Sequence, residues 1–281
     1  MRRVRRAWAW GWGWRVAMVI VGGSVMALAT WIATTPARTL SRGTRAIATH
    51  DVSSRTRPPR SHARPPSIRA PFVLPAGGSG PRAALELVVY PPRDASVKRP
   101  VALMLHGMCG APESTCEPIA RALTRDHWLV CPRGPAACEG GGATWSMRDT
   151  PAQIEASVGR LAALESAGVD AGAPRTLLGF SFGATVAVAV AERGPWARVV
   201  LLGAEVHPDA YALRRAGVQH VVLGSGDYDM MKGQMIAASE LLRRGGLASH
   251  FVSFGPVGHA FPSDIDAWIA RALAWNGDEA I

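Results

Sequence analysis

The sequence predicts an α/β fold in which a mostly parallel sheet carries helices on both faces. From about residue 85 onward, short runs rich in leucine and β-branched residues alternate with longer amphipathic segments. Strands that alternate with helices in this way form a parallel sheet covered on both faces. Residues 101–105 are continuously apolar, which is typical of a strand buried on both faces. With 281 residues, of which 48% are hydrophobic, the chain has ample material for such a core.

The expected elements follow one another along the chain. Residues 85–90 alternate in polarity as a half-exposed strand does, and Pro91 ends that strand. Residues 151–167 predict a helix because four apolar residues share one stripe at helical spacing, namely Ile154, Val158, Leu161 and Leu164. The other expected strands are residues 101–105, 128–131, 176–178, 198–202, 220–223 and 249–253. The other expected helices are residues 117–125, 184–189, 230–244 and 265–274.

The net charge of +10 is concentrated at the N-terminus. Residues 1–70 carry 13 arginines and a single acidic residue, whereas the rest of the chain has 18 basic and 20 acidic residues. The predicted folded part is therefore close to neutral. A basic groove for nucleic acid has little support there, so we expect no nucleic-acid partner.

Residues 16–34 form a run of 19 residues without a charge. A helix of this length spans about 28 Å at about 1.5 Å per residue, close to the hydrocarbon core of a bilayer. Arginines before it favour a cytoplasmic N-terminus, so residues 1–35 are predicted to anchor the chain in a membrane, with the domain outside the cytoplasm. The alternative is a cleaved signal peptide, with residues 16–26 as its apolar region, and a secreted or periplasmic product. Both interpretations imply export.

Residues 36–70 are rich in proline, arginine, serine and threonine. Such a composition cannot bury enough apolar surface to fold, so this segment is predicted to be a disordered linker. The folded domain is then expected to comprise residues 71–281. No internal repeat is apparent.

All four cysteines, Cys109, Cys116, Cys131 and Cys138, lie within 30 residues of one another. An even, clustered set in an exported domain predicts two disulfides. Three pairings are compatible with the sequence, and the most local one joins Cys109 to Cys116 and Cys131 to Cys138. Free thiols and a zinc site are the alternatives, although no Cys-x-x-Cys pair is present.

A Gly-Phe-Ser-Phe-Gly motif from Gly179 to Gly183 connects an expected strand with an expected helix. A serine at the centre of Gly-x-Ser-x-Gly sits on a sharp turn that exposes its hydroxyl, and the glycines leave room for that turn. Ser181 is therefore the candidate nucleophile. An ordinary glycine-rich turn is the alternative, since the chain has 30 glycines.

A serine hydroxyl needs a base within hydrogen-bond reach and a third group that orients the base. His259 is the candidate base because it follows the last expected strand on a short loop. Asp227, just after the strand over residues 220–223, is the preferred acid. Asp229 is the reserve, because it is equally suited to cap the following helix.

An oxyanion also requires two backbone N–H donors that already point toward it. The loop His106-Gly-Met-Cys-Gly110 follows a buried strand and offers the Met108 N–H, while Phe182 offers the first N–H after the nucleophile. A plain turn between strand and helix is the alternative for this loop. No metal cluster, phosphate loop or dinucleotide fingerprint competes with these motifs, so no cofactor or metal is expected.

These motifs together resemble the α/β-hydrolase family over about residues 85–276. Pro132-Arg-Gly, Gly140-Gly-Gly-Ala-Thr-Trp145 and Gly258-His259 are most similar to the compact carboxylesterase, lysophospholipase and dienelactone-hydrolase branch. That branch lacks a large lid. The resemblance implies an open site and makes His106, Gly107 and Trp145 candidates for the loops that contact substrate.

The order Ser, Asp, His along the chain is the order described for this family. The resemblance implies a serine hydrolase that cleaves a small-molecule or lipid ester, or a thioester, through an acyl-enzyme, and the N-terminal segment adds the expectation that this enzyme is exported. A serine peptidase of the same fold is one alternative. A catalytically silent binding or structural protein of the cell envelope is another.

Overall fold

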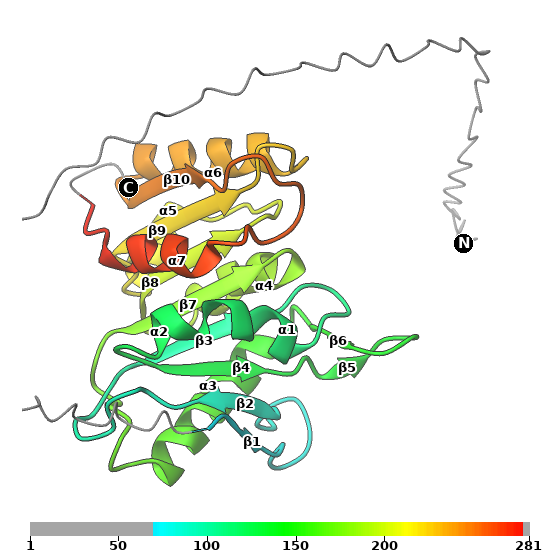
Figure 1. Ribbon diagram of the computed structural model, residues 1–281, viewed down its shortest axis with the longest axis vertical. Coiled ribbons are helices and arrows are strands. Elements are labelled where there is room, and N and C mark those ends of the chain that lie inside the picture. Colours follow the sequence, from blue (N-terminus) through cyan, green and yellow to red (C-terminus); the bar gives the residue numbers. More distant parts are fainter. Residues whose placement is uncertain (1–69, 278–281) are drawn as a thin grey trace, which may run out of the picture. The chain divides into compact units, whose positions relative to one another are not determined.

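An eight-stranded sheet forms the centre of the computed structural model, which describes residues 70–277 (Figure 1). The strand order is β1-β2-β4-β3-β7-β8-β9-β10. Its strands are β1 (Phe72–Leu74), β2 (Leu87–Tyr90), β3 (Val101–Leu105), β4 (Trp128–Pro132), β7 (Arg175–Phe180), β8 (Trp196–Leu202), β9 (His220–Ser225) and β10 (Ala248–Ser253). The strand β2 is antiparallel to both β1 and β4, and all pairs from β4 to β10 are parallel. The predicted mostly parallel sheet is confirmed.

Helices cover both faces of this sheet. They are α1 (Pro112–Cys116), the 3₁₀ turn η1 (Glu117–Ile119), α2 (Ala120–Leu123), α3 (Thr150–Leu164), α4 (Phe182–Ala191), α5 (Ala210–Arg215), α6 (Lys232–Arg244) and α7 (Ile265–Ala274). Buried residues of α3, α4, α5 and α6 share one apolar cluster, and those of α1, α2 and α7 share the other. Strand β3 supplies Leu103 to the first cluster and Met104 to the second, because neighbouring residues of a strand face opposite sides. Burial on both faces explains why this strand is continuously apolar.

The expected helix over residues 117–125 is interrupted. Residues there form the end of α1, the turn η1 and the short helix α2. Pro118 lies within η1, and proline has no backbone N–H with which to continue a helical ladder. The structure also contains β1 and α5, which the hydrophobic pattern did not predict.

A small hairpin of β5 (Ala136–Ala137) and β6 (Ala143–Thr144) projects from the sheet after β4 (Figure 1). We call residues 134–148, which contain this hairpin, the insert. We call His106–Gly110, which follows β3, the oxyanion loop. An isolated bridge between Gly110 and Ala143 connects the two segments.

Two disulfides are present, as the sequence predicted, but the most local pairing is wrong. Cys109 pairs with Cys138, and Cys116 pairs with Cys131. Cys116 and Cys131 are both fully buried in the cluster that α1 and α2 cover, whereas Cys109 lies exposed in the oxyanion loop. The fold places Cys116 at the end of α1 against β4, away from Cys109. One disulfide is therefore nested inside the other along the chain.

The predicted segments 1–35 and 36–70 lie almost entirely outside the described residues. Over residues 70–277, no helix has the length and apolar character needed to cross a membrane. The same part of the chain contains no group of three or more histidine, cysteine, aspartate or glutamate side chains suited to a metal ion.

The parallel arrangement brings the ends of four strands to one edge of the sheet. The oxyanion loop follows β3, Ser181 follows β7, Asp229 follows β9 and His259 lies in the loop after β10. Ligands of open α/β sheets bind at this carboxyl edge. Residues that are far apart in sequence therefore meet there.

Candidate active site

Ser181 occupies the sharp turn between β7 and α4. Its φ of 54° and ψ of −129° lie in a region that residues other than glycine rarely adopt. A Cβ at Gly179 would lie 2.4 Å from the Gly183 carbonyl oxygen, and a Cβ at Gly183 would lie 2.2 Å from the Leu105 carbonyl oxygen. Only glycine fits at either position. The motif therefore holds the serine in a strained conformation that costs roughly 1–3 kcal/mol, a feature that clusters at functional sites.

His259 lies between the serine and an aspartate. Its Nε2 is 3.0 Å from the Ser181 Oγ, and its Nδ1 is 3.0 Å from the Asp229 Oδ2. Because a carboxylate only accepts hydrogen bonds, the Nδ1–H donates to Asp229, which leaves Nε2 free to accept the serine proton. Phe180 stacks on the imidazole, with ring centroids 5.1 Å apart. The three side chains have the geometry of a nucleophile, its base and an orienting acid.

The carboxylate that contacts His259 belongs to Asp229. The prediction that Asp227 is the partner of this histidine is therefore wrong. The chain turns after β9, where the Asp229 N–H donates to the Gly226 carbonyl at 3.2 Å, and this turn brings the second aspartate toward His259. Asp229 is 5% exposed, and its other oxygen accepts a hydrogen bond from the Met231 N–H at 3.0 Å. Asp229 therefore contacts the histidine and also stabilises the turn before α6, but it does not cap that helix, whose N-cap residue is Met231.

Asp227 instead points away from the histidine. Its Oδ1 accepts hydrogen bonds from the Lys232 Nζ at 2.7 Å and from the Ser253 Oγ at 2.6 Å. The hydrogen bond from Lys232, followed by that from Ser253, lowers the pKa of the Asp227 carboxyl group below its usual value. Since Ser253 ends β10, Asp227 connects the loop that carries Asp229 with the loop that carries His259.

The two predicted oxyanion donors come from two different segments, one before and one after Ser181 in the sequence. Phe182 is the first residue of α4, and Met108 is a 63% exposed residue of the oxyanion loop. Within residues 70–277, neither backbone N–H donates to another backbone group. A Cβ at Gly107 would lie only 3.2 Å from the Ser181 Cβ, so the loop passes directly beside the nucleophile. These two N–H groups are therefore the candidate donors to an oxyanion.

His106 and Trp145, predicted to lie near substrate, are buried instead. His106 is fully buried, Trp145 is 5% exposed, and their ring centroids are 4.5 Å apart. The Trp145 Nε1–H donates to the His106 carbonyl at 2.8 Å, and the Gly134 N–H donates to the His106 Nε2 at 3.1 Å. These side chains support the oxyanion loop from behind, whereas Gly107 remains half-buried beside Ser181.

The folded state is expected to lose stability in mild acid through His106. Burial, more than any other factor, lowers the pKa of the His106 imidazole below its usual value of about 6.5. The unfolded chain then binds this proton at a higher pH than the folded chain does. Stability is therefore fully present above pH 6.5 or so and falls as the pH decreases from there toward the pKa of the folded state, by at most about 1.4 kcal/mol per pH unit for one proton.

Urea unfolding at pH 7.5 and pH 5.5 measures this effect. His106→Gln removes the titrating group, so the variant should lose less stability between the two pH values than the unsubstituted protein does. An equal pH dependence in His106→Gln and the unsubstituted protein would show that His106 does not contribute.

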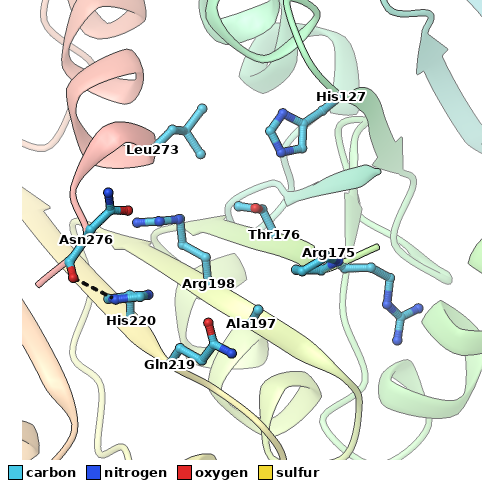
Figure 2. Close-up of a pocket in the computed structure, with 10 residues that line it drawn as sticks. His127, Arg175, Thr176, Ala197, Arg198, Gln219, His220, Leu273 and Asn276 are labelled. Carbon is cyan, nitrogen blue, oxygen red and sulfur yellow. Dashed lines mark hydrogen bonds between the residues drawn. The ribbon is translucent and has the colours of Figure 1, made fainter. Parts of the chain in front are cut away.

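A cavity of about 330 Å³ lies at the opposite edge of the sheet (Figure 2). Arg175, Arg198 and His220 line it from the beginnings of β7, β8 and β9. The Arg198 Nη1 donates to the Ala272 and Trp275 carbonyl oxygens at 3.1 and 2.5 Å, so this half-buried cation binds the C-terminal end of α7. Since a cation stabilises the negative end of a helix dipole, Arg198 has a structural role in this cavity.

Sequence reasoning did not identify two residues that shape the site. Phe180 stacks on His259, and Ser253 hydrogen-bonds to Asp227. Phe180 directly precedes Ser181 in the sequence, and this position could have identified it as a residue of the site. Ser253 and Asp227 are 26 residues apart, and no local pattern connects them.

Comparison with known proteins gives matches in structure only. No protein-family model matches the chain, and no curated protein matches its sequence. Among solved structures, a carboxylesterase from Mesorhizobium loti is 23% identical with a TM-score of 0.55, and the match covers 73% of this chain and 98% of that one. The esterase PE8 is 18% identical with a TM-score of 0.53, covering 72% of this chain and 99% of that one.

A third similar structure is the S-formylglutathione hydrolase from Staphylococcus aureus. It is 16% identical with a TM-score of 0.54, and the match covers 74% of this chain and 99% of that one. At such identities the likeness concerns the fold. The strand order, the strained serine after β7 and these structural matches agree, and the chain has the α/β-hydrolase fold.

Proposed function

We propose that this protein is a serine hydrolase of carboxylic esters or thioesters. The observation that carries the proposal is the hydrogen-bonded series Ser181, His259 and Asp229, in which both contacts are 3.0 Å long. Ser181 is held on a strained turn at the carboxyl edge of the sheet, where ligands of such folds bind. Esterases and hydrolases among the similar structures make this the best supported activity.

The reaction follows from the positions of the donors and acceptors. His259 Nε2 takes the proton of the Ser181 hydroxyl while Oγ bonds to the carbonyl carbon of the ester. The N–H groups of Met108 and Phe182 donate to the resulting oxyanion. When the tetrahedral intermediate collapses, His259 protonates the leaving alcohol or thiol. Water, deprotonated by the same imidazole, then attacks the acyl-enzyme and releases the acid.

Asp229 is assigned the orienting role. Its carboxylate accepts the Nδ1–H of His259 and so fixes the tautomer in which Nε2 is the base. It also stabilises the imidazolium that forms when the serine proton is transferred. Asp227 is assigned a structural role between two loops, because Lys232 and Ser253 occupy its carboxylate.

We also propose that the protein is exported, with an N-terminal membrane anchor or a cleaved signal peptide. The apolar run over residues 16–34 supports export. Two disulfides support it independently, since disulfides persist mainly in oxidising compartments. The membrane-anchored form, with the domain outside the cytoplasm, is the favoured one.

One labelling experiment tests both proposals. A fluorophosphonate probe is expected to label Ser181 in the full-length protein, with the adduct located by peptide mass spectrometry. Probing membrane and soluble fractions of expressing cells separates the anchored form from the released one. Hydrolysis of p-nitrophenyl butyrate, but not of fluorogenic aminoacyl amides, is the expected specificity. A folded protein that neither reacts with the probe nor cleaves the ester would contradict the enzymatic proposal.

A further inference from the structure

We propose that the Cys109–Cys138 disulfide positions the oxyanion loop for catalysis, so that its reduction by a dithiol lowers turnover while the domain remains folded. This inference rests on the proposed hydrolase function, since it concerns the Met108 N–H that would donate to the oxyanion. Cys109 directly follows Met108. The disulfide joins Cys109 to Cys138 of the insert, and the Cα atoms of the two cysteines are 5.6 Å apart.

The oxyanion loop depends on the insert at several points. The Ala143 N–H donates to the Gly110 carbonyl at 3.0 Å, and the two segments form an isolated bridge there. A Cβ at Gly142 would lie 2.1 Å from the Cys109 carbonyl oxygen, so the two backbones are in close contact. The hydrogen bonds from Gly134 and Trp145 to His106 hold the beginning of the loop. The disulfide is the covalent connection between the two segments, and it holds the loop at Cys109, the residue after Met108.

The backbone at Cys109 shows why a covalent constraint matters. Cys109 has a φ of 53°, and apart from Ser181 it is the only residue other than glycine with a positive φ in the described part of the chain. Such a conformation is unfavourable for an ordinary side chain and persists where the surroundings enforce it. Once the disulfide is broken, relaxation of φ at Cys109 reorients the adjoining Met108–Cys109 peptide plane and thereby displaces Met108, whose N–H belongs to the preceding peptide.

The two disulfides differ in accessibility, which makes the first one selectively reducible. Cys109 is exposed and Cys138 is half-buried, whereas Cys116 and Cys131 are fully buried. Thiol–disulfide exchange requires direct attack of a thiolate on a sulfur atom. One thiolate of the dithiol attacks the Cys109–Cys138 bond and forms a mixed disulfide, and its second thiol then displaces the protein sulfur. Two electrons and two protons pass to the cysteines, and the dithiol becomes a disulfide.

The expected effect is on the chemical step. Loss of one oxyanion donor lowers kcat about 100- to 1000-fold in well-studied hydrolases, and a displaced donor loses part of that stabilisation. We therefore expect reduction to lower kcat for p-nitrophenyl butyrate roughly 10- to 100-fold, with KM changed less than about threefold. A boronic-acid transition-state analogue should lose affinity in parallel with kcat/KM, because it occupies the same donors.

The test begins with the full-length protein treated with dithiothreitol under native conditions. Alkylation and peptide mapping should find Cys109 and Cys138 modified and Cys116 and Cys131 unmodified. Circular dichroism and thermal unfolding should show a folded protein, and oxidised glutathione, added to a sample that has not been alkylated, should restore activity. The double variant C109S/C138S should have the kinetics of the reduced protein and no response to dithiothreitol.

The buried disulfide provides the matched control. We expect C116S/C131S to have a lower melting temperature but a kcat within about threefold of the unsubstituted protein at a temperature where it is folded. If that variant does not fold, the native reduction experiment still decides the question, because it leaves the buried disulfide intact.

Three results would overturn the proposal. They are an unchanged kcat after confirmed reduction of Cys109–Cys138, a fall in kcat that coincides with unfolding, and a loss of turnover without loss of affinity for the boronic acid. A different result would contradict the hydrolase proposal itself. In that case the protein with both disulfides intact would show neither ester hydrolysis nor labelling of Ser181 by the fluorophosphonate probe.

Discussion

Ser181→Ala is expected to lower kcat/KM for p-nitrophenyl butyrate roughly 10⁴- to 10⁶-fold. Alanine keeps the Cβ and hence the steric environment of the turn, but it removes the Oγ that lies 3.0 Å from the His259 Nε2. No acyl-enzyme can then form. The remaining rate would come from substrate binding and the oxyanion donors alone. Stopped assays with purified protein, together with loss of fluorophosphonate labelling, measure the effect.

Ser114→Ala is the matched control for this variant. Ser114 is an exposed residue of α1 whose hydroxyl donates only to the Ala111 carbonyl. We expect its kcat/KM to stay within about twofold of the unsubstituted protein. Activity that survives in Ser181→Ala, after a contaminating esterase has been excluded, would refute the assignment of the nucleophile.

The second large effect is expected at Asp229. Asp229→Asn should lower kcat about 10⁴-fold, because an amide that donates to Nδ1 favours the wrong tautomer and leaves a proton on Nε2. The His259 Nε2 would then carry a proton and could no longer accept the proton of the Ser181 hydroxyl. KM should change little, since Asp229 is buried behind the histidine.

Asp227→Asn is the discriminating control, because it makes the same chemical change two residues away. Its side chain contacts Lys232 and Ser253, so we expect less than about a tenfold loss of kcat and a modest loss of thermal stability. Full kinetic curves for both variants, with melting temperatures, test the pair. A larger loss of kcat in Asp227→Asn than in Asp229→Asn would reverse the assignment of the acid.

The mostly parallel sheet and the sharp turn at Ser181 were predictable from local patterns. A strand buried on both faces is continuously apolar, and the helix α3 shows its apolar residues at helical spacing. The Gly-x-Ser-x-Gly motif is equally local, because the glycines act within five residues on the serine between them. His259 was predictable because the order of the elements placed it in the loop after the last strand.

The choice between Asp227 and Asp229 was not predictable in this way. Both follow β9 closely, and which of them contacts His259 depends on how the chain turns at Gly226. A Cβ at Gly226 would lie 2.0 Å from the Val257 carbonyl oxygen, so this turn packs tightly against the loop that carries the histidine. Only the contact between two loops from neighbouring strands decides the orientation.

The sequence by itself determined the fold class and the presence of two disulfides, and it pointed to Ser181 and His259 as candidate site residues, because periodicity, a turn motif and an even cysteine count are local signals. The tertiary structure alone decided that Asp229 rather than Asp227 contacts His259, that His106 and Trp145 are buried, and that Cys109 pairs with Cys138. Each of these depends on segments distant in sequence, which packing and backbone geometry bring together at one edge of the sheet.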